Sequence, residues 1–189
     1  MLIIYAHPNK EGHCGYILKR IEKSLKKISV EYEILDLYVE DYNPVMQPSE
    51  HYTSGHREIS EETKRYQKLI KENDRFIIIY PTWWNATPAI LKGFFDRTLT
   101  SHFSFRYEGI IPRGLLNGKV AVVTTTGGPI ILEKLIFGNR SIKAVVNETL
   151  RFCGLKAKGY MIGSATKLTS GQKRKINKKI NKILNFILD

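Results

Sequence analysis

Short strand-like apolar runs alternate along the chain with longer segments in which apolar residues recur every three or four positions. The runs predict buried β-strands, at Leu2–Ala6, Tyr32–Asp36, Arg75–Tyr80, Lys119–Thr124 and Lys156–Ile162. The second pattern predicts amphipathic helices, at about His13–Ile28, Glu58–Glu72, Pro88–Thr98, Ser141–Phe152 and Ser170–Leu188. An irregular stretch rich in Pro, Ser, His and Tyr covers about Tyr42–Gly55.

This alternation predicts an α/β fold: a doubly wound parallel sheet of five strands in the order 2-1-3-4-5, with helices on both faces. The chain shows no internal repeat or second core, so residues 1–189 are expected to form a single domain. In this order the winding reverses between the first and third strands, and ligands bind there at the carboxyl ends of the strands. The expected ligand loops are therefore AHPNKEGHCGY, PTWWNATP and TTTGGPIILEK.

The first loop leads into a helix and offers donors for an anion. Backbone N–H groups and the helix dipole favour a phosphate, and His7, Lys10 and His13 add side-chain donors. The loop contains neither the dinucleotide-binding fingerprint nor the P-loop motif, and a plain helix entry with incidental histidines is the alternative. A metal site built from His7, His13 and Cys14 is not expected, because no carboxylate or second cysteine stands at ligand spacing.

The second loop carries two adjacent tryptophans, Trp83 and Trp84, in an exposed-looking turn. Pro81 ends the preceding strand, and Thr87-Pro88 predicts a helix with Thr87 as N-cap and Pro88 at the first helical position. The alternative to a ligand-binding pair is one core-anchoring tryptophan and one surface tryptophan. The neighbouring loops favour the ligand-binding interpretation.

The third loop combines hydroxyls with two glycines, in Thr125, Thr126, Gly127 and Gly128. Paired glycines let a backbone approach a ligand closely and present N–H donors, which suit a ring that becomes negatively charged. A tight turn alone would also explain Gly-Gly-Pro. Together the three loops fit an aromatic ligand that carries a phosphate, and flavin is the best candidate.

Composition and charge argue against a nucleic-acid-binding, membrane or disulfide-rich secreted protein. The net charge of +12 arises from 30 Lys and Arg against 18 Asp and Glu, with much of the excess in KLTSGQKRKINKKINKIL. Isoleucines recur there at helical spacing, which predicts a docked helix with a solvated basic face rather than a nucleic-acid or membrane site. No apolar run approaches the ~20 residues of a membrane span. The start MLIIYAHP is not a signal peptide, and Cys14 and Cys153 form no disulfide framework, so we expect a cytoplasmic protein with reduced thiols.

Four segments in the same order resemble the flavodoxin-like NAD(P)H:quinone oxidoreductases, which include DT-diaphorase-like enzymes and ancillary subunits of bacterial potassium-efflux systems. They are His7-Pro8, the block from Pro81 through Trp84 to PAILKGFFDR, Thr125–Gly128, and Phe152-Cys153-Gly154. The resemblance covers nearly the whole chain, and the PAILKG…DR block is its most specific part.

The resemblance implies a role for each loop. His7 would lie near the flavin phosphates, and Thr125–Gly128 would border the pyrimidine end of the isoalloxazine. One side of that ring would be lined by Pro81, Thr82, Trp83, Trp84 and Asn85. Phe105 and Tyr107 would cover the substrate slot, which Trp84 also borders, from the other subunit of a homodimer. Lys92, Asp96 and Arg97 would be structural.

The chain departs from the family pattern at two places. DT-diaphorase-like members have a Tyr and a His after the glycines that balance charge during hydride transfer, whereas this chain reads PIILEKL and then Asn139. Proton handling would then fall to water, to Tyr107 or to the substrate. The first loop has Gly12, His13 and Cys14 in place of a Ser/Thr/Asn cluster, so FMN is expected with FAD as the alternative.

The expected function is a homodimeric flavin oxidoreductase with a ping-pong route. NAD(P)H would give a hydride to flavin N5 and leave, and a quinone-like or other small electrophilic acceptor would take the electrons from the same slot. A regulatory flavoprotein subunit bound to a membrane transporter is the alternative. An electron-carrier flavodoxin is disfavoured by the charge of +12 and by Phe105 and Tyr107.

Overall fold

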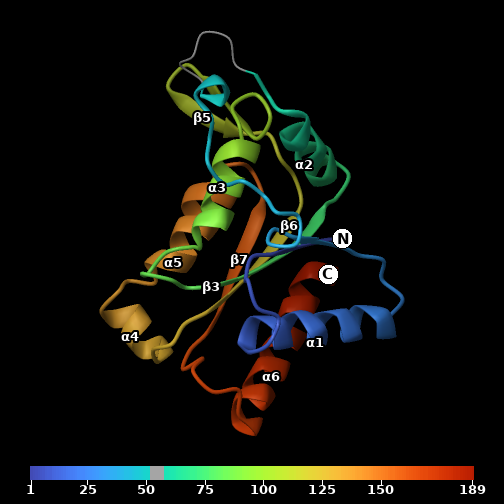
Figure 1. The fold of residues 1–189 in the computed structure, drawn as a ribbon, viewed down its shortest axis with the longest axis vertical. Coiled ribbons are helices and arrows are strands. Elements are labelled where there is room, and N and C mark those ends of the chain that lie inside the picture. Colours follow the sequence, from blue (N-terminus) through green and yellow to red (C-terminus); the bar gives the residue numbers. More distant parts are fainter. Residues whose placement is uncertain (52–57) are drawn as a thin grey trace.

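The computed structural model of the protein describes residues 1–51 and 58–189 (Figure 1). Its parallel strands are β1 Leu2–Tyr5, β2 Glu33–Asp36, β3 Arg75–Pro81, β6 Lys119–Thr125 and β7 Lys156–Ile162. A separate antiparallel hairpin consists of β4 Phe105–Glu108 and β5 Ile111–Gly114. The α-helices are α1 His13–Lys27, α2 Glu61–Lys71, α3 Ala89–Thr98, α4 Ile130–Leu135, α5 Arg140–Lys143 and α6 Ser170–Leu188. A 3₁₀ turn, η1, covers Pro48–Glu50, and a π-helix, η2, covers Ala144–Arg151.

The five parallel strands form one sheet in the order β2-β1-β3-β6-β7. Because β6 and β7 are the fourth and fifth of the predicted strands, this agrees with the predicted order 2-1-3-4-5. Ile4 pairs with Ile78, which pairs with Val122 on the next strand. These central strands are buried on both faces, and a strand buried on both faces has a continuous apolar sequence rather than an alternating one.

Alternate residues of the central strand β3 face two separate apolar layers. Ile77 and Ile79 pack with α1 and α6, whereas Ile78 and Tyr80 pack with α2, α3 and η2. Figure 1 shows α1 and α6 on one side of the sheet and α3 and α5 on the other. The predicted helices on both faces are therefore confirmed.

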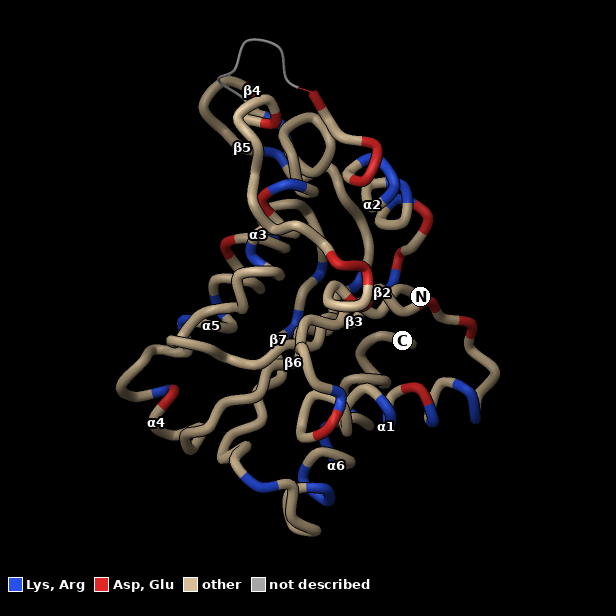
Figure 2. The backbone as a smooth tube through the Cα atoms, viewed as in Figure 1, with Lys and Arg blue, Asp and Glu red and all other residues tan. Residues whose placement is uncertain are grey.

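The C-terminal helix α6 is amphipathic, as predicted. Its apolar side chains are buried against the sheet, namely Ile176, Ile180, Ile183, Leu184 and Ile187. The lysines and arginine between them are largely exposed. Figure 2 shows Lys and Arg on α1 and α2 as well as on α6, so the basic excess is spread over several elements.

Four parts of the structure differ from the prediction. The β4–β5 hairpin and the short helix α4 were not predicted. The predicted helix Ser141–Phe152 is instead a short α-helix, α5, that continues into the π-helix η2. The prediction of Thr87 as N-cap is wrong: Pro88 has an extended ψ of 146° and is itself the N-cap, so α3 begins at Ala89.

The predicted irregular stretch Tyr42–Gly55 contains η1, and its residues 52–55 lie outside the described part of the chain. This stretch is tied to α3 by Arg97. The Arg97 guanidinium donates to both carboxylate oxygens of Glu50 at 2.8–3.0 Å and to Glu62 at 3.2 Å, and only 7% of its side chain is exposed. Arg97 is thus a structural residue.

Within the described ranges, none of the helices has the length and apolar character that crossing a membrane requires.

Candidate active site

The three predicted ligand loops meet at one edge of the sheet, where β1, β3 and β6 end. The Cys14 sulfur lies 3.3 Å from Thr125 Oγ1, which joins the start of α1 to the end of β6. The Thr82 hydroxyl lies 2.9 Å from that of Thr124. The rings of His7 and Trp83 have their centroids 6.1 Å apart. The loops therefore form one continuous surface, as the strand order predicts.

The first loop is held in place by its own hydrogen bonds. The Tyr5 hydroxyl donates to the Asn9 carbonyl at 3.1 Å. The backbone N–H of Asn9 donates to His7 Nδ1 at 3.0 Å, and the backbone N–H of Glu11 donates to the side-chain oxygen of Asn9 at 2.6 Å. Because His7 Nδ1 accepts a hydrogen bond, the proton of its neutral ring resides on Nε2, which is left to donate.

Helix α1 begins without a side-chain cap. Its N-cap is Gly12, with a φ of 105°, and its first turn carries no acidic residue. A Cβ on Gly15 would lie 1.7 Å from the Lys10 carbonyl oxygen, so only glycine allows this close packing of helix and loop. His13 is 8% exposed, its Nε2 has no hydrogen-bond partner, and burial lowers its pKa. This helix end combines free backbone donors with a neutral imidazole, which suits an anion.

Lys10 does not point at this helix end in the structure. Its amine forms an ion pair with Asp36 at 2.7 Å, at the carboxyl end of β2. Asp36 is nearly buried, with 8% of its side chain exposed. The pair neutralises a carboxylate that would otherwise repel a phosphate from this edge.

The second loop is a tight two-residue turn. The amide and carbonyl of Trp83 bond those of Ala86 at 2.9–3.1 Å, and between them Trp84 and Asn85 have φ values of 50° and 56°. Trp83 is 41% exposed and Trp84 is 100% exposed, so the alternative of one core tryptophan is wrong. A bulky residue with a left-handed backbone and an exposed ring is strained, and such strain gathers at functional sites.

The third loop presents an open backbone beside a buried acid. No atom lies within 4 Å of the position that a Cβ on Gly127 would take. Glu133, on α4, is 6% exposed; its Oε1 accepts a hydrogen bond from the Thr126 hydroxyl, and its Oε2 has no partner. The sequence interpretation assigned no role to Glu133, although an acid inside the apolar run IILEKLIF was a signal of burial.

Each loop thus contributes one buried polar atom that has no partner: His13 Nε2, Asn85 Oδ1 and Glu133 Oε2. A buried polar atom without a hydrogen bond costs about 1–3 kcal/mol. Their gathering at one edge, beside an open glycine and exposed tryptophans, fits a polar, flat ligand with an anionic group. The residues present therefore fit a flavin.

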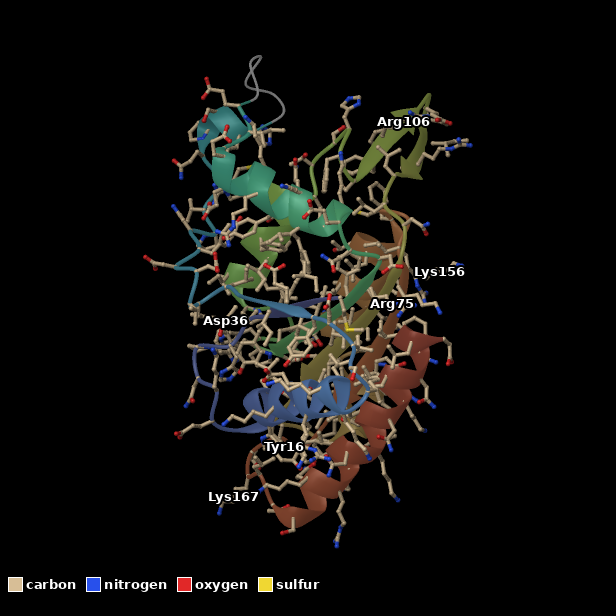
Figure 3. All side chains as sticks on the ribbon, turned by 90° about the vertical axis from the view of Figure 1, so that its right-hand side faces the viewer. Tyr16, Asp36, Arg75, Arg106, Lys156 and Lys167 are labelled. Carbon is tan, nitrogen blue, oxygen red and sulfur yellow. The ribbon has the colours of Figure 1, made fainter. Side chains whose placement is uncertain are left out.

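Phe105 and Tyr107 lie away from this edge. Both belong to the β4–β5 hairpin, at the top of Figure 1, whereas α4 lies at the lower left. In Figure 3, Arg106 of the hairpin is far above Lys167, which follows β7 at the carboxyl edge. The Phe105 ring packs on Phe152 with centroids 5.0 Å apart, beside a groove of about 1020 Å³. One chain alone does not bring Trp84 and Tyr107 together.

A family model described as the flavodoxin-like fold matches residues 1–187. The chain belongs to this flavodoxin-like family. It is 32% identical to an uncharacterized NAD(P)H oxidoreductase of Haemophilus influenzae, over 82% of this chain and 78% of that protein. It is 27% identical to the human ribosyldihydronicotinamide dehydrogenase (quinone), over 93% of this chain and 85% of that one.

A solved structure, the FMN-dependent NADH-azoreductase of Bacillus anthracis in complex with FMN, matches with a TM-score of 0.77 and 17% identity. The match covers 96% of this chain and 98% of that chain, and it shows the common fold. The resemblance of this flavodoxin-like chain to the NAD(P)H:quinone oxidoreductases is confirmed.

Proposed function

We propose that the protein is a flavin-dependent NAD(P)H oxidoreductase that delivers electrons to a quinone-like or other small electrophilic acceptor. The observation that carries this proposal is the edge at which three loops each leave a buried polar atom without a partner around two exposed tryptophans. The names of the relatives compared above support it, since each is an oxidoreductase. The transporter-subunit alternative has no such support.

FMN is the proposed cofactor. It carries one phosphate, which suits the helix start at Gly12, where no side chain caps the helix and His13 lies beside it. His7 Nε2 adds a donor, and Trp83 and Trp84 cover the ring from the turn after β3. The backbone at Gly127 and the hydroxyls of Thr125 and Thr126 border its polar end. Bound there, FMN would accept a hydride from NAD(P)H and pass it to the acceptor, and the protein would supply orientation and exclude water.

The active form is proposed to be a homodimer in the cytoplasm. Phe105 and Tyr107 lie at the end of the folded molecule opposite the proposed flavin site. They can therefore line the substrate slot of that site only from a second copy of the chain. Tyr107 is 61% exposed in the single chain, which leaves its ring available for such a contact. The two cysteines, Cys14 and Cys153, are buried and unpaired, as in proteins of a reducing compartment.

The proposal is tested by spectra of the protein reconstituted with FMN, FAD or riboflavin under anaerobic conditions. Flavin absorbance that bleaches with NADH or NADPH and returns with a quinone is expected. Because riboflavin lacks the phosphate, it serves as a matched control for His13→Leu, which removes the side-chain donor. The variant is expected to weaken FMN binding about 10- to 150-fold, the loss of one hydrogen bond to a charged group, with riboflavin unchanged. Failure to bind any flavin would contradict the proposal.

Mixing two inactive variants tests whether the site spans two chains. In a mixed dimer of Trp84→Ala and Tyr107→Ala chains, one site contains both changes and the other contains neither. Activity should therefore return on mixing if Tyr107 acts on the partner's site. If both residues act within one chain, every site carries a defect and mixing restores nothing.

A further inference from the structure

Glu133 is a buried acid that the proposed reaction has not yet used. It lies on α4, directly after the Gly127-Gly128 turn, and is 6% exposed. The Thr126 hydroxyl donates to Oε1, and the position of a Cβ on Gly128 is 3.9 Å from the same oxygen. Oε2 is buried and has no partner. The carboxyl group is therefore fixed by one oxygen and open at the other, beside the loop proposed to border the flavin's polar end.

The surroundings give this carboxyl no ion pair among the described residues. The ionisable groups on the segments beside it are His13 and Cys14 at the start of α1, Lys134 on α4, Arg140 and Lys143 on α5, and Lys179 on α6. Burial lowers the pKa of His13 and raises that of Cys14 to about 11, so both are neutral near neutral pH. Three of the lysines, Lys134, Lys143 and Lys179, line a cavity of about 290 Å³ next to α4. A buried carboxylate without a bonded cation takes up a proton readily when a second negative charge appears nearby.

The balance of the proposed reaction requires one proton from the site. NAD(P)H gives up a hydride, and a quinone becomes a hydroquinone by gaining that hydride and one further proton. Resting on the proposed function, we infer that Glu133 Oε2 takes up this proton when negative charge enters the adjoining ligand and gives it up as the acceptor is reduced. Glu133 is then a catalytic residue of the Gly127–Glu133 segment, and solvent replaces its proton in each cycle.

A purely structural role for Glu133 is the competing account, in which the side chain only anchors Thr126 to α4. Glu133→Gln separates the two, because the amide oxygen still accepts from Thr126 but the side chain has no carboxyl group to hold a proton. Glu31→Gln, at an exposed position before β2, is the matched control for the charge change. Both variants are loaded with FMN, and the midpoint potential of the bound flavin is measured against pH above neutrality.

The slope of that potential with pH counts the protons taken up with two electrons. We expect two protons to be taken up in the wild type and in Glu31→Gln, and one in Glu133→Gln. The slope of the potential with pH in Glu133→Gln should therefore be half that of the wild type. Equal slopes would overturn the inference while leaving the flavin function standing. If the wild type itself binds no flavin, the proposed function fails first.

Infrared difference spectra of the wild type give a test that needs no variant. Photoreduction of the bound FMN, without nicotinamide, should produce a protonated carboxyl band that shifts when glutamate is labelled with carbon-13. Changes in imidazole bands alone would assign the proton to a histidine and overturn the inference. The absence of any new carboxyl band would overturn it as well.

Discussion

The backbone of Trp84 is strained in the folded chain, and its side chain buries no area that would stabilise the fold. Its φ of 50° is left-handed, and its side chain is 100% exposed. The left-handed conformation costs a residue with a side chain about 1–2 kcal/mol, a cost that glycine avoids. Glycine also gives the unfolded chain freedom worth about 0.5–1 kcal/mol relative to alanine. Trp84→Gly should therefore be more stable than Trp84→Ala by about 0.5–1 kcal/mol, although neither loses buried area.

Flavin binding should fall equally in the two variants. Both variants lose the same ring, and stacking of an aromatic side chain on a flat ring is worth about 1–3 kcal/mol. The dissociation constant for FMN should thus rise about 5- to 150-fold in both. Urea unfolding of the flavin-free proteins gives the stability difference as a change of midpoint at constant slope. Titration of FMN fluorescence gives the affinities.

Two results would refute this reasoning. If Trp84→Gly is no more stable than Trp84→Ala, the left-handed turn at residues 84 and 85 does not form in solution. If either variant binds FMN as tightly as the wild type, the exposed ring does not cover the flavin. The pair of variants keeps the two conclusions separate, since backbone strain differs between them and ring contact does not.

Three further predictions concern the framework of the site. Gly15→Ala places a Cβ 1.7 Å from the Lys10 carbonyl oxygen and should lower the free energy of unfolding by about 1–3 kcal/mol or more in urea, whereas Gly171→Ala, whose Cβ has no contact shorter than 3.8 Å, should not. Arg97→Met removes the cation that faces buried Glu50 and should cost about 3–5 kcal/mol; Lys92→Met, in an exposed pair, should cost about 0–1. Because burial lowers the folded-state pKa of His13, the unfolded chain binds its proton more readily, and stability should fall as pH drops below about 6.5. His13→Gln should lack that part of the pH dependence.

The sheet could be predicted because burial on both faces leaves a clear record in the sequence. Ile77, Ile78 and Ile79 are all buried, so the run is apolar throughout and reads as a central strand. The β4–β5 hairpin leaves no such record, since the residues of Phe105–Glu108 and Ile111–Gly114 are mostly exposed. α4 was missed for a related reason: its apolar residues face outward, with Leu135 77% exposed, and they do not mark a buried stripe.

The sequence predicted which loops form the site, but not how their side chains are oriented. Strand order alone placed the three loops at one edge of the sheet. The hydrogen bond between the side chains of Cys14 and Thr125 agrees with that placement. The orientation of each side chain depended on local geometry that a sequence does not display. Lys10 turns to Asp36, and Glu133 turns inward to Thr126, although both residue types usually face solvent.

Three features that lower the stability of this chain lie where a ligand would remove them. A phosphate at Gly12 would give His13 Nε2 a partner, a polar ring edge would do the same for Glu133 Oε2, and a flat ring would cover Trp84. Each unpartnered buried atom costs the ligand-free protein about 1–3 kcal/mol. That cost vanishes on binding, so it adds to the affinity for a ligand that satisfies all of them together. FMN should therefore raise the unfolding midpoint more than riboflavin does at equal free ligand concentration, because only FMN reaches the helix start and the glycine turn at once.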